Sequence, residues 1–153
     1  MHLLFHMNLR PSGSLLKGRL LLMDGHRLKQ RYIATSGAPQ WQQWQDQGAR
    51  GKGPIPRCDQ VGLPEYTVCT TRHTSDIPGI SGGCYDILPV TLPALKCGTA
   101  RSHFLIHYDA NAPGSAGCIV LTTEGGWAHF EGQMAELREG GIDQLPLQVD
   151  YSY

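Results

Sequence analysis

Glycine and proline cut the apolar stretches of this sequence into runs of only a few residues. The chain of 153 residues holds 19 glycines and 10 prolines. Frequent turn formers between short apolar runs are typical of strands joined by tight loops, whereas helical domains need longer uninterrupted segments. We therefore predict a mainly β fold with one helix, of the β-rich α+β class, in a single domain.

Local signals predict the individual elements. Asp24-Gly25 indicates a tight turn between strands at 19–23 and 28–35. Thr122 or Thr123 can cap a helix whose apolar residues recur at helical spacing and which ends at Gly140-Gly141. Its core-facing residues are expected to be Trp127, Phe130, Met134 and Leu137. Further strands are expected at 66–70, 84–90, 104–107, 119–121 and 145–151.

Residues 1–17 are expected to form a flexible leader, which leaves 18–153 as the folded domain. The stretch from Met1 to Met7 is apolar but is interrupted by His2 and His6. It lacks a basic segment followed by a continuous apolar run, so we do not expect it to act as a secretory signal.

Charge and hydropathy argue against two classes of partner. Thirteen basic and thirteen acidic residues cancel, and no basic block stands out, so we expect no nucleic acid partner. The apolar runs fall far short of the roughly 20 residues that cross a bilayer, so we expect no membrane span.

Because the chain has five cysteines, disulfides within the chain leave at least one thiol unpaired. Two disulfides, Cys58–Cys69 and Cys84–Cys97, would leave Cys118 free and reactive. Buried reduced cysteines are an equally good interpretation. Zinc binding is disfavoured because the cysteines form no Cys-x-x-Cys pair, so we expect neither a metal nor a cofactor.

Cys118 has a histidine as a candidate partner. His107 ends the apolar run 104–106, a loop of turn formers follows, and Ser115-Ala116-Gly117-Cys118 leads into the next apolar run. Two adjacent strands can thus bring an imidazole and a thiol together, as nucleophilic catalysis requires. The alternatives are a buried apolar role for Cys118 and a hydrogen-bonded core role for His107.

This segment resembles the catalytic signature of L,D-transpeptidase-like domains, in which a histidine, a loop and Ser/Thr-x-Gly-Cys-Ile follow one another. The opening hairpin and Gly53-Pro54-Ile55-Pro56 also follow the order of those domains, so the likeness extends over roughly 18–151. It implies a β-sandwich or barrel. Ala116 and Val120 depart from the typical His-Gly-Cys and Arg positions, and a compact branch of peptidoglycan-targeting toxins is more similar.

The resemblance implies that Cys118 is the nucleophile and His107 its base. We expect Ser115 to orient His107 through its hydroxyl or its carbonyl, and the backbone N–H groups of Gly117 and Cys118 to bind the oxyanion. Ala116, which like Gly117 is small, would let the substrate approach. Arg101, on the same strand face as His107 if that strand is regular, would pair with a substrate carboxylate.

The expected function is that of a cysteine enzyme acting on peptide stems of bacterial peptidoglycan through a thioester. The reaction would be L,D-transpeptidation, carboxypeptidase or endopeptidase cleavage, or D-amino-acid exchange. We expect action in the periplasm or cell wall, either after delivery by a secretion machine or phage particle or after release from the cytoplasm, with an immunity, carrier or virion protein as partner. The alternatives are a non-catalytic structural or binding module and a cysteine peptidase for ordinary L-peptides.

Overall fold

The computed structural model describes residues 1–153 except 76–79, 81, 93–100 and 111–112. Its elements, in chain order, are strands, two 3₁₀ turns and one α-helix among the described residues. They are β1 (His2–Asn8), β2 (Gly18–Asp24), β3 (Arg27–Ser36), η1 (Trp44–Gly48), η2 (Cys58–Gln60), β4 (Tyr66–Cys69), β5 (His73–Thr74), β6 (Gly83–Leu88), β7 (Leu105–Tyr108), β8 (Ile119–Leu121), α1 (Glu124–Glu139) and β9 (Gln144–Ser152).

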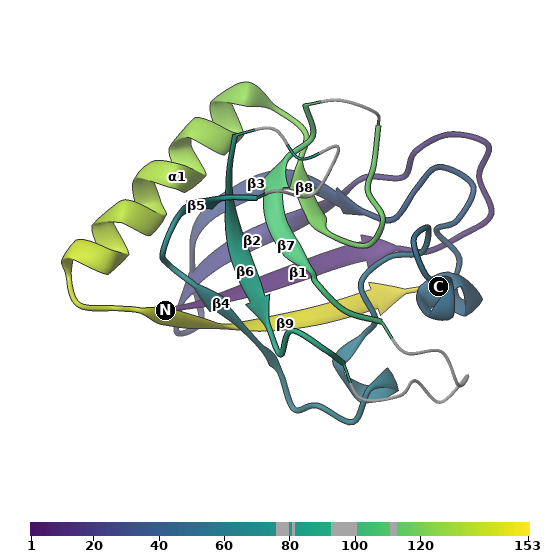
Figure 1. Ribbon diagram of the computed structural model, residues 1–153, viewed down its shortest axis with the longest axis horizontal. Coiled ribbons are helices and arrows are strands. Elements are labelled where there is room, and N and C mark those ends of the chain that lie inside the picture. Colours follow the sequence, from purple (N-terminus) through teal and green to yellow (C-terminus); the bar gives the residue numbers. More distant parts are fainter. Residues whose placement is uncertain (76–79, 81, 93–100, 111–112) are drawn as a thin grey trace.

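The strands form one sheet that closes on itself (Figure 1). Neighbouring strands follow the order β4-β9-β1-β2-β3-β8-β7-β6, and β4 pairs again with β6, so that these eight strands complete a barrel. β5 extends the sheet beyond β6. Most neighbours are antiparallel, but β1 with β9 and β7 with β8 are parallel. The predicted β-rich fold with one helix is confirmed for the described part of the chain.

The β2–β3 hairpin forms where the sequence predicts it. Asp24 pairs with Arg27, so the two-residue turn is Gly25-His26, one position later than expected. Gly25 has a φ of 59°, a conformation that glycine adopts without the steric cost of a side chain.

The prediction of a flexible leader is wrong for the first strand. β1 lies between β2 and β9, and its residues Leu3, Phe5 and Met7 are at most 1% exposed. His2 and His6 do not interrupt an apolar run; they occupy the outward positions of a strand whose apolar residues alternate with them. Residues 18–153 therefore form no complete barrel without this segment.

The helix is confirmed in position and capping. Thr123 is the N-cap, and its side chain accepts a hydrogen bond from the N–H of Gly126 at 3.0 Å. α1 lies against the barrel (Figure 1). Phe130 and Met134 are buried in the barrel core, where Phe130 contacts the rings of Tyr32 and Tyr85 edge-on.

The predicted Cys58–Cys69 disulfide is wrong, because both residues carry free thiols. Cys58 lies in η2 and is buried in the core, whereas Cys69 ends β4 and is half-buried, so their side chains occupy different environments. Cys84 and Cys118 are also unbridged. The proposed partner of Cys84, Cys97, lies outside the described residues.

Candidate active site

His107 and Cys118 lie on the same outer face of the barrel wall. β7 and β8 are parallel, with Ile106 opposite Ile119 and His107 opposite Val120. Ile106 and Ile119 belong to the barrel core, so the alternating residues beside them face outward. Cys118 directly precedes β8 and packs in a second, smaller apolar cluster with Leu105, Val120 and Cys84. The two strands therefore bring the imidazole and the thiol to diagonal positions of one surface.

The imidazole of His107 is held in one tautomer. Its Nδ1 lies 2.9 Å from the carbonyl oxygen of Tyr108, and a carbonyl can only accept a hydrogen bond. Nδ1 therefore carries the proton, and Nε2 keeps its lone pair. The residue is 6% exposed, and burial lowers the pKa of His107 below its usual 6.5. At neutral pH the ring is an uncharged base whose lone pair is on Nε2.

The thiol of Cys118 is protonated in this arrangement. The residue is 9% exposed, and burial raises the pKa of its thiol to about 11. Among the described residues, no hydrogen bond joins Cys118 to His107. A thiolate is therefore not stabilised by the imidazole here, and the thiol must move toward Nε2 before a proton can be transferred.

Ser115 organises the turn that leads to the cysteine. Its Oγ donates to the carbonyl of Cys118 at 2.6 Å and accepts from the N–H groups of Gly37 and Gly117, each at 3.2 Å. The prediction that the hydroxyl of Ser115 orients His107 is wrong, because this hydroxyl faces its own turn and the end of β3. The N–H of Gly117, predicted to bind an oxyanion, is engaged by Ser115 instead.

Gly117 leaves no room for a side chain. Its φ is 130°, and a Cβ would lie 2.5 Å from both Nη2 of Arg101 and Cε1 of Phe104. Its carbonyl accepts a hydrogen bond from the hydroxyl of Ser36 at 2.8 Å. The glycine before Cys118 is thus required by the packing beneath the turn. Ala116 is the exposed residue of the turn and the part most open to a substrate.

The buried side chain of Arg101 stabilises the turn before Cys118. It is 3% exposed, and its guanidinium donates to the carbonyls of Gln47, Gly53, Pro54 and Ala116 at 2.8, 2.9, 2.5 and 3.0 Å. The prediction that Arg101 binds a substrate carboxylate is wrong. It assumed a regular strand from 101 to 107, but His103 has a φ of 62° and β7 begins only at Leu105.

We expect Gly117→Ala to lower the free energy of unfolding by on the order of 2 kcal/mol, because the new Cβ meets Arg101 and Phe104 at a strained φ. Urea denaturation measures the change. Gly132→Ala is the matched control: it lies within α1 with nothing within 4 Å of its Cβ position, so alanine should stabilise the protein there. Equal effects of the two substitutions would contradict the packing role of Gly117.

A second group, which was not predicted from the sequence, lies beside this face. The thiol of Cys84 donates to the carbonyl of His73 at 3.4 Å, and its Sγ lies 3.7 Å from each ring nitrogen of His73. Nε2 of His73 is 2.9 Å from Oδ1 of Asp86. Cys84 lies opposite His107 in the β6–β7 pair, so the group adjoins the candidate base. Burial first, and Asp86 second, raise the pKa of Cys84.

Only one local signal points to this group. Cys84 and Asp86 are two residues apart in a strand and therefore share a face, but the pairing with His73 depends on the short strand β5, which lies between two predicted strands and was not itself predicted. Within the described ranges, no cluster of three or more His, Cys, Asp or Glu side chains could hold a metal ion. No helix of the described residues is long and apolar enough to cross a membrane.

We expect alkylation of Cys118 by iodoacetamide to be slow at pH 7 and to accelerate about tenfold per pH unit up to pH 10, because only the thiolate reacts and the pKa of the thiol is about 11. Peptide mapping by mass spectrometry assigns the label, with Cys118→Ala to confirm the modified position. A rate that is already constant between pH 7 and pH 9 would contradict a protonated resting thiol.

Comparison with known proteins gives no match: no family model, curated protein or solved structure is similar to this chain.

Proposed function

We propose that the protein is a cysteine-dependent enzyme that acts on the peptide stems of bacterial peptidoglycan, with Cys118 as nucleophile and His107 as base. The observation that carries this proposal is the hydrogen bond from Nδ1 of His107 to the carbonyl of Tyr108. It leaves Nε2 unprotonated on the face of the sheet to which Cys118 belongs, which is the state that a general base needs.

The proposed reaction begins with both groups uncharged. As the sulfur of Cys118 attacks a peptide carbonyl carbon of the stem, its proton passes to Nε2 of His107. The carbon–nitrogen bond then breaks, and His107 returns the proton to the departing amine, which leaves a thioester on Cys118. Water releases the acid in a hydrolytic reaction, and an amine releases a new amide in an exchange or transpeptidation.

The substrate class rests on the resemblance of the segment from His107 to Ile119 to L,D-transpeptidase-like domains. Val120 stands where typical members have arginine, and Ala116 where they have histidine. These departures favour hydrolysis or D-amino-acid exchange over cross-link formation. A peptidoglycan substrate puts the site of action in the periplasm or cell wall.

The experiment is mass spectrometry of purified muropeptides after incubation with the wild-type protein, Cys118→Ala and Cys84→Ala. We expect wild type and Cys84→Ala to release a terminal residue, split a cross-link or exchange an amino acid, and Cys118→Ala to do none of these. Loss of activity only in Cys84→Ala would show that Cys84, and not Cys118, is the nucleophile. Unchanged muropeptides with folded wild-type protein would refute the proposal.

A second candidate is a non-catalytic binding or structural module. The buried, protonated thiol of Cys118 is the observation that favours it, because nucleophilic cysteines are ordinarily accessible and have a depressed pKa. This function predicts that Cys118→Ala keeps every property of the wild type, and that folded wild-type protein leaves muropeptides intact at any pH.

A further inference from the structure

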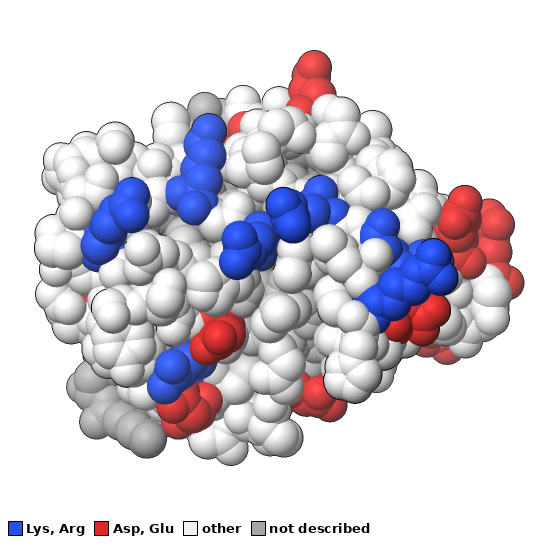
Figure 2. Space-filling view, turned by 180° about the vertical axis from the view of Figure 1, so that it is seen from behind, with Lys and Arg blue, Asp and Glu red and all other residues white. Residues whose placement is uncertain are grey.

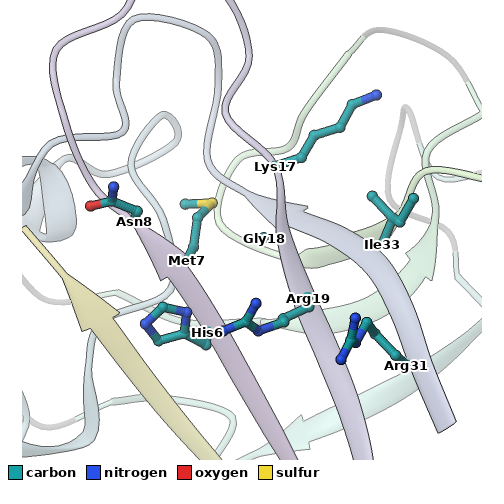
Figure 3. Close-up of a pocket in the computed structure, with 8 residues that line it drawn as sticks. All are labelled: His6, Met7, Asn8, Lys17, Gly18, Arg19, Arg31 and Ile33. Carbon is teal, nitrogen blue, oxygen red and sulfur yellow. The ribbon is translucent and has the colours of Figure 1, made fainter.

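A groove of about 320 Å³ lies on the outside of the barrel, over β1, β2 and β3 (Figure 3). None of its lining residues takes part in the candidate active site, which lies on β7 and β8. Its lining is dominated by basic side chains and contains no acidic residue. The lining residues are His6, Met7, Asn8, Lys17, Gly18, Arg19, Arg31 and Ile33.

The register of the strands concentrates positive charge in this groove. Arg19 lies directly opposite His6 on β1, and Arg31 is diagonal to Arg19 because Leu21 is the residue opposite Arg31. Lys17 is two residues before Arg19. Figure 2, seen from this side of the molecule, shows Lys and Arg side chains crossing the middle of the surface, with acidic side chains mostly toward the lower and right-hand parts.

Among the described residues, no acidic side chain forms an ion pair with these charges. The ion pairs among the described residues involve Arg57, Arg72, Arg138 and His73, none of which lines the groove. Arg19 and Arg31 are diagonal rather than directly opposite, and both are exposed, so solvent weakens their mutual repulsion. An anion bound in the groove would compensate these positive charges.

The size and charge of the groove indicate the kind of anion. Lys17, Arg19 and Arg31 carry three positive charges, which a single carboxylate would leave largely uncompensated. Arginine forks match phosphate oxygens in pairs, and the volume is at the lower end of the range for small-molecule sites. Ile33, which is 50% exposed at the rim, offers apolar surface to an organic group attached to the anion.

We propose that this groove binds the diphosphate group of a small organic ligand, with Arg19 and Arg31 holding the phosphate oxygens and Lys17 adding charge. The two linked phosphates supply the two to three negative charges that the groove lacks. This proposal does not depend on the proposed enzymatic function, since it concerns other residues and a binding equilibrium.

Isothermal titration calorimetry at low salt tests it, with inorganic pyrophosphate, uridine diphosphate and citrate as probes. We expect pyrophosphate or uridine diphosphate to bind and citrate, a carboxylate of similar charge, to bind at least about tenfold more weakly. Tighter binding of uridine diphosphate would identify an organic ligand as the source of the diphosphate. Equal binding of the two would identify the diphosphate alone. Citrate binding as tightly as pyrophosphate would overturn the proposal, since only charge would then be recognised.

The double variant Arg19→Gln/Arg31→Gln should raise the Kd for pyrophosphate by at least about tenfold. Arg10→Gln/Arg50→Gln is the matched control, because it removes the same charge from exposed positions outside the groove. Arg19 and Arg31 are exposed, so the double variant should be about as heat-stable as the wild type, and loss of folding would not explain lost binding. Absence of pyrophosphate binding to wild type at millimolar concentration, or equal effects of the two variants, would overturn the proposal.

Discussion

His107→Asn should lower the rate of the proposed turnover of peptidoglycan stem peptides by about 10²- to 10⁴-fold, the contribution of a positioned general base. Asparagine can still donate its amide to the carbonyl of Tyr108, which holds Nδ1 of His107 in the wild type. It has no group equivalent to Nε2 that could accept the proton of Cys118. Steady-state kinetics should therefore show a fall in kcat with little change in KM.

The matched control is His73→Asn, which removes the imidazole that contacts Cys84 instead. It should retain nearly full activity. The opposite result, with His73→Asn inactive and His107→Asn active, would move the reaction to the group formed by Cys84, His73 and Asp86.

The pH profile of the wild type provides an independent readout. The base must be uncharged, and burial lowers the pKa of His107 below 6.5. Activity should therefore persist as the pH falls to 6.5 and be lost only below it, when the imidazole becomes protonated. An acid limb centred above pH 7 would show that another group is the base.

Arg101→Met should lower the free energy of unfolding by about 3–5 kcal/mol, because it removes the donor from four carbonyls at a buried site. In a domain of this size the melting temperature should fall by on the order of 10 °C. Arg101 joins Gln47, Gly53 and Pro54 to Ala116, so the turn before Cys118 should also loosen. Faster alkylation of Cys118 in the variant would report that loosening.

Arg138→Met is the control, since the side chain of Arg138 is half-exposed and pairs with Asp143 at 4.0 Å. The substitution should change the free energy of unfolding by no more than about 0.5 kcal/mol. Thermal unfolding followed by circular dichroism measures both variants. A decrease in the free energy of unfolding of less than about 1 kcal/mol for Arg101→Met would show that Arg101 does not stabilise the turn.

Elements with a strong local signal could be predicted from the sequence. The hairpin around Gly25 and the helix capped by Thr123 depend on turn and cap chemistry within a few residues, and both form within one residue of the predicted positions. β1 was missed because two histidines were interpreted as interruptions of an apolar run, although residues at alternate positions of a strand face opposite sides.

Only those parts of the candidate site that lie close together in the sequence could be predicted. His107 and Cys118 lie on one face because β7 and β8 are neighbours with short intervening sequence. The role of Arg101 depends on carbonyls of residues 47, 53 and 54, and the contact of His73 with Cys84 depends on β5. Contacts between residues far apart in the sequence leave no periodic pattern. The sequence therefore did not predict that Arg101 binds buried carbonyls rather than a substrate.

The position of β1 between β2 and β9 has a consequence for biosynthesis. β1 precedes β9 in the chain and needs it as a neighbour, so during translation the ring of strands cannot close until Ser152 has left the ribosome. Until then Leu3, Phe5 and Met7 have only one strand beside them, and non-local pairing of this kind is slow to form. The barrel wall that carries His107 and Cys118 is therefore completed only after β9 has paired with β1.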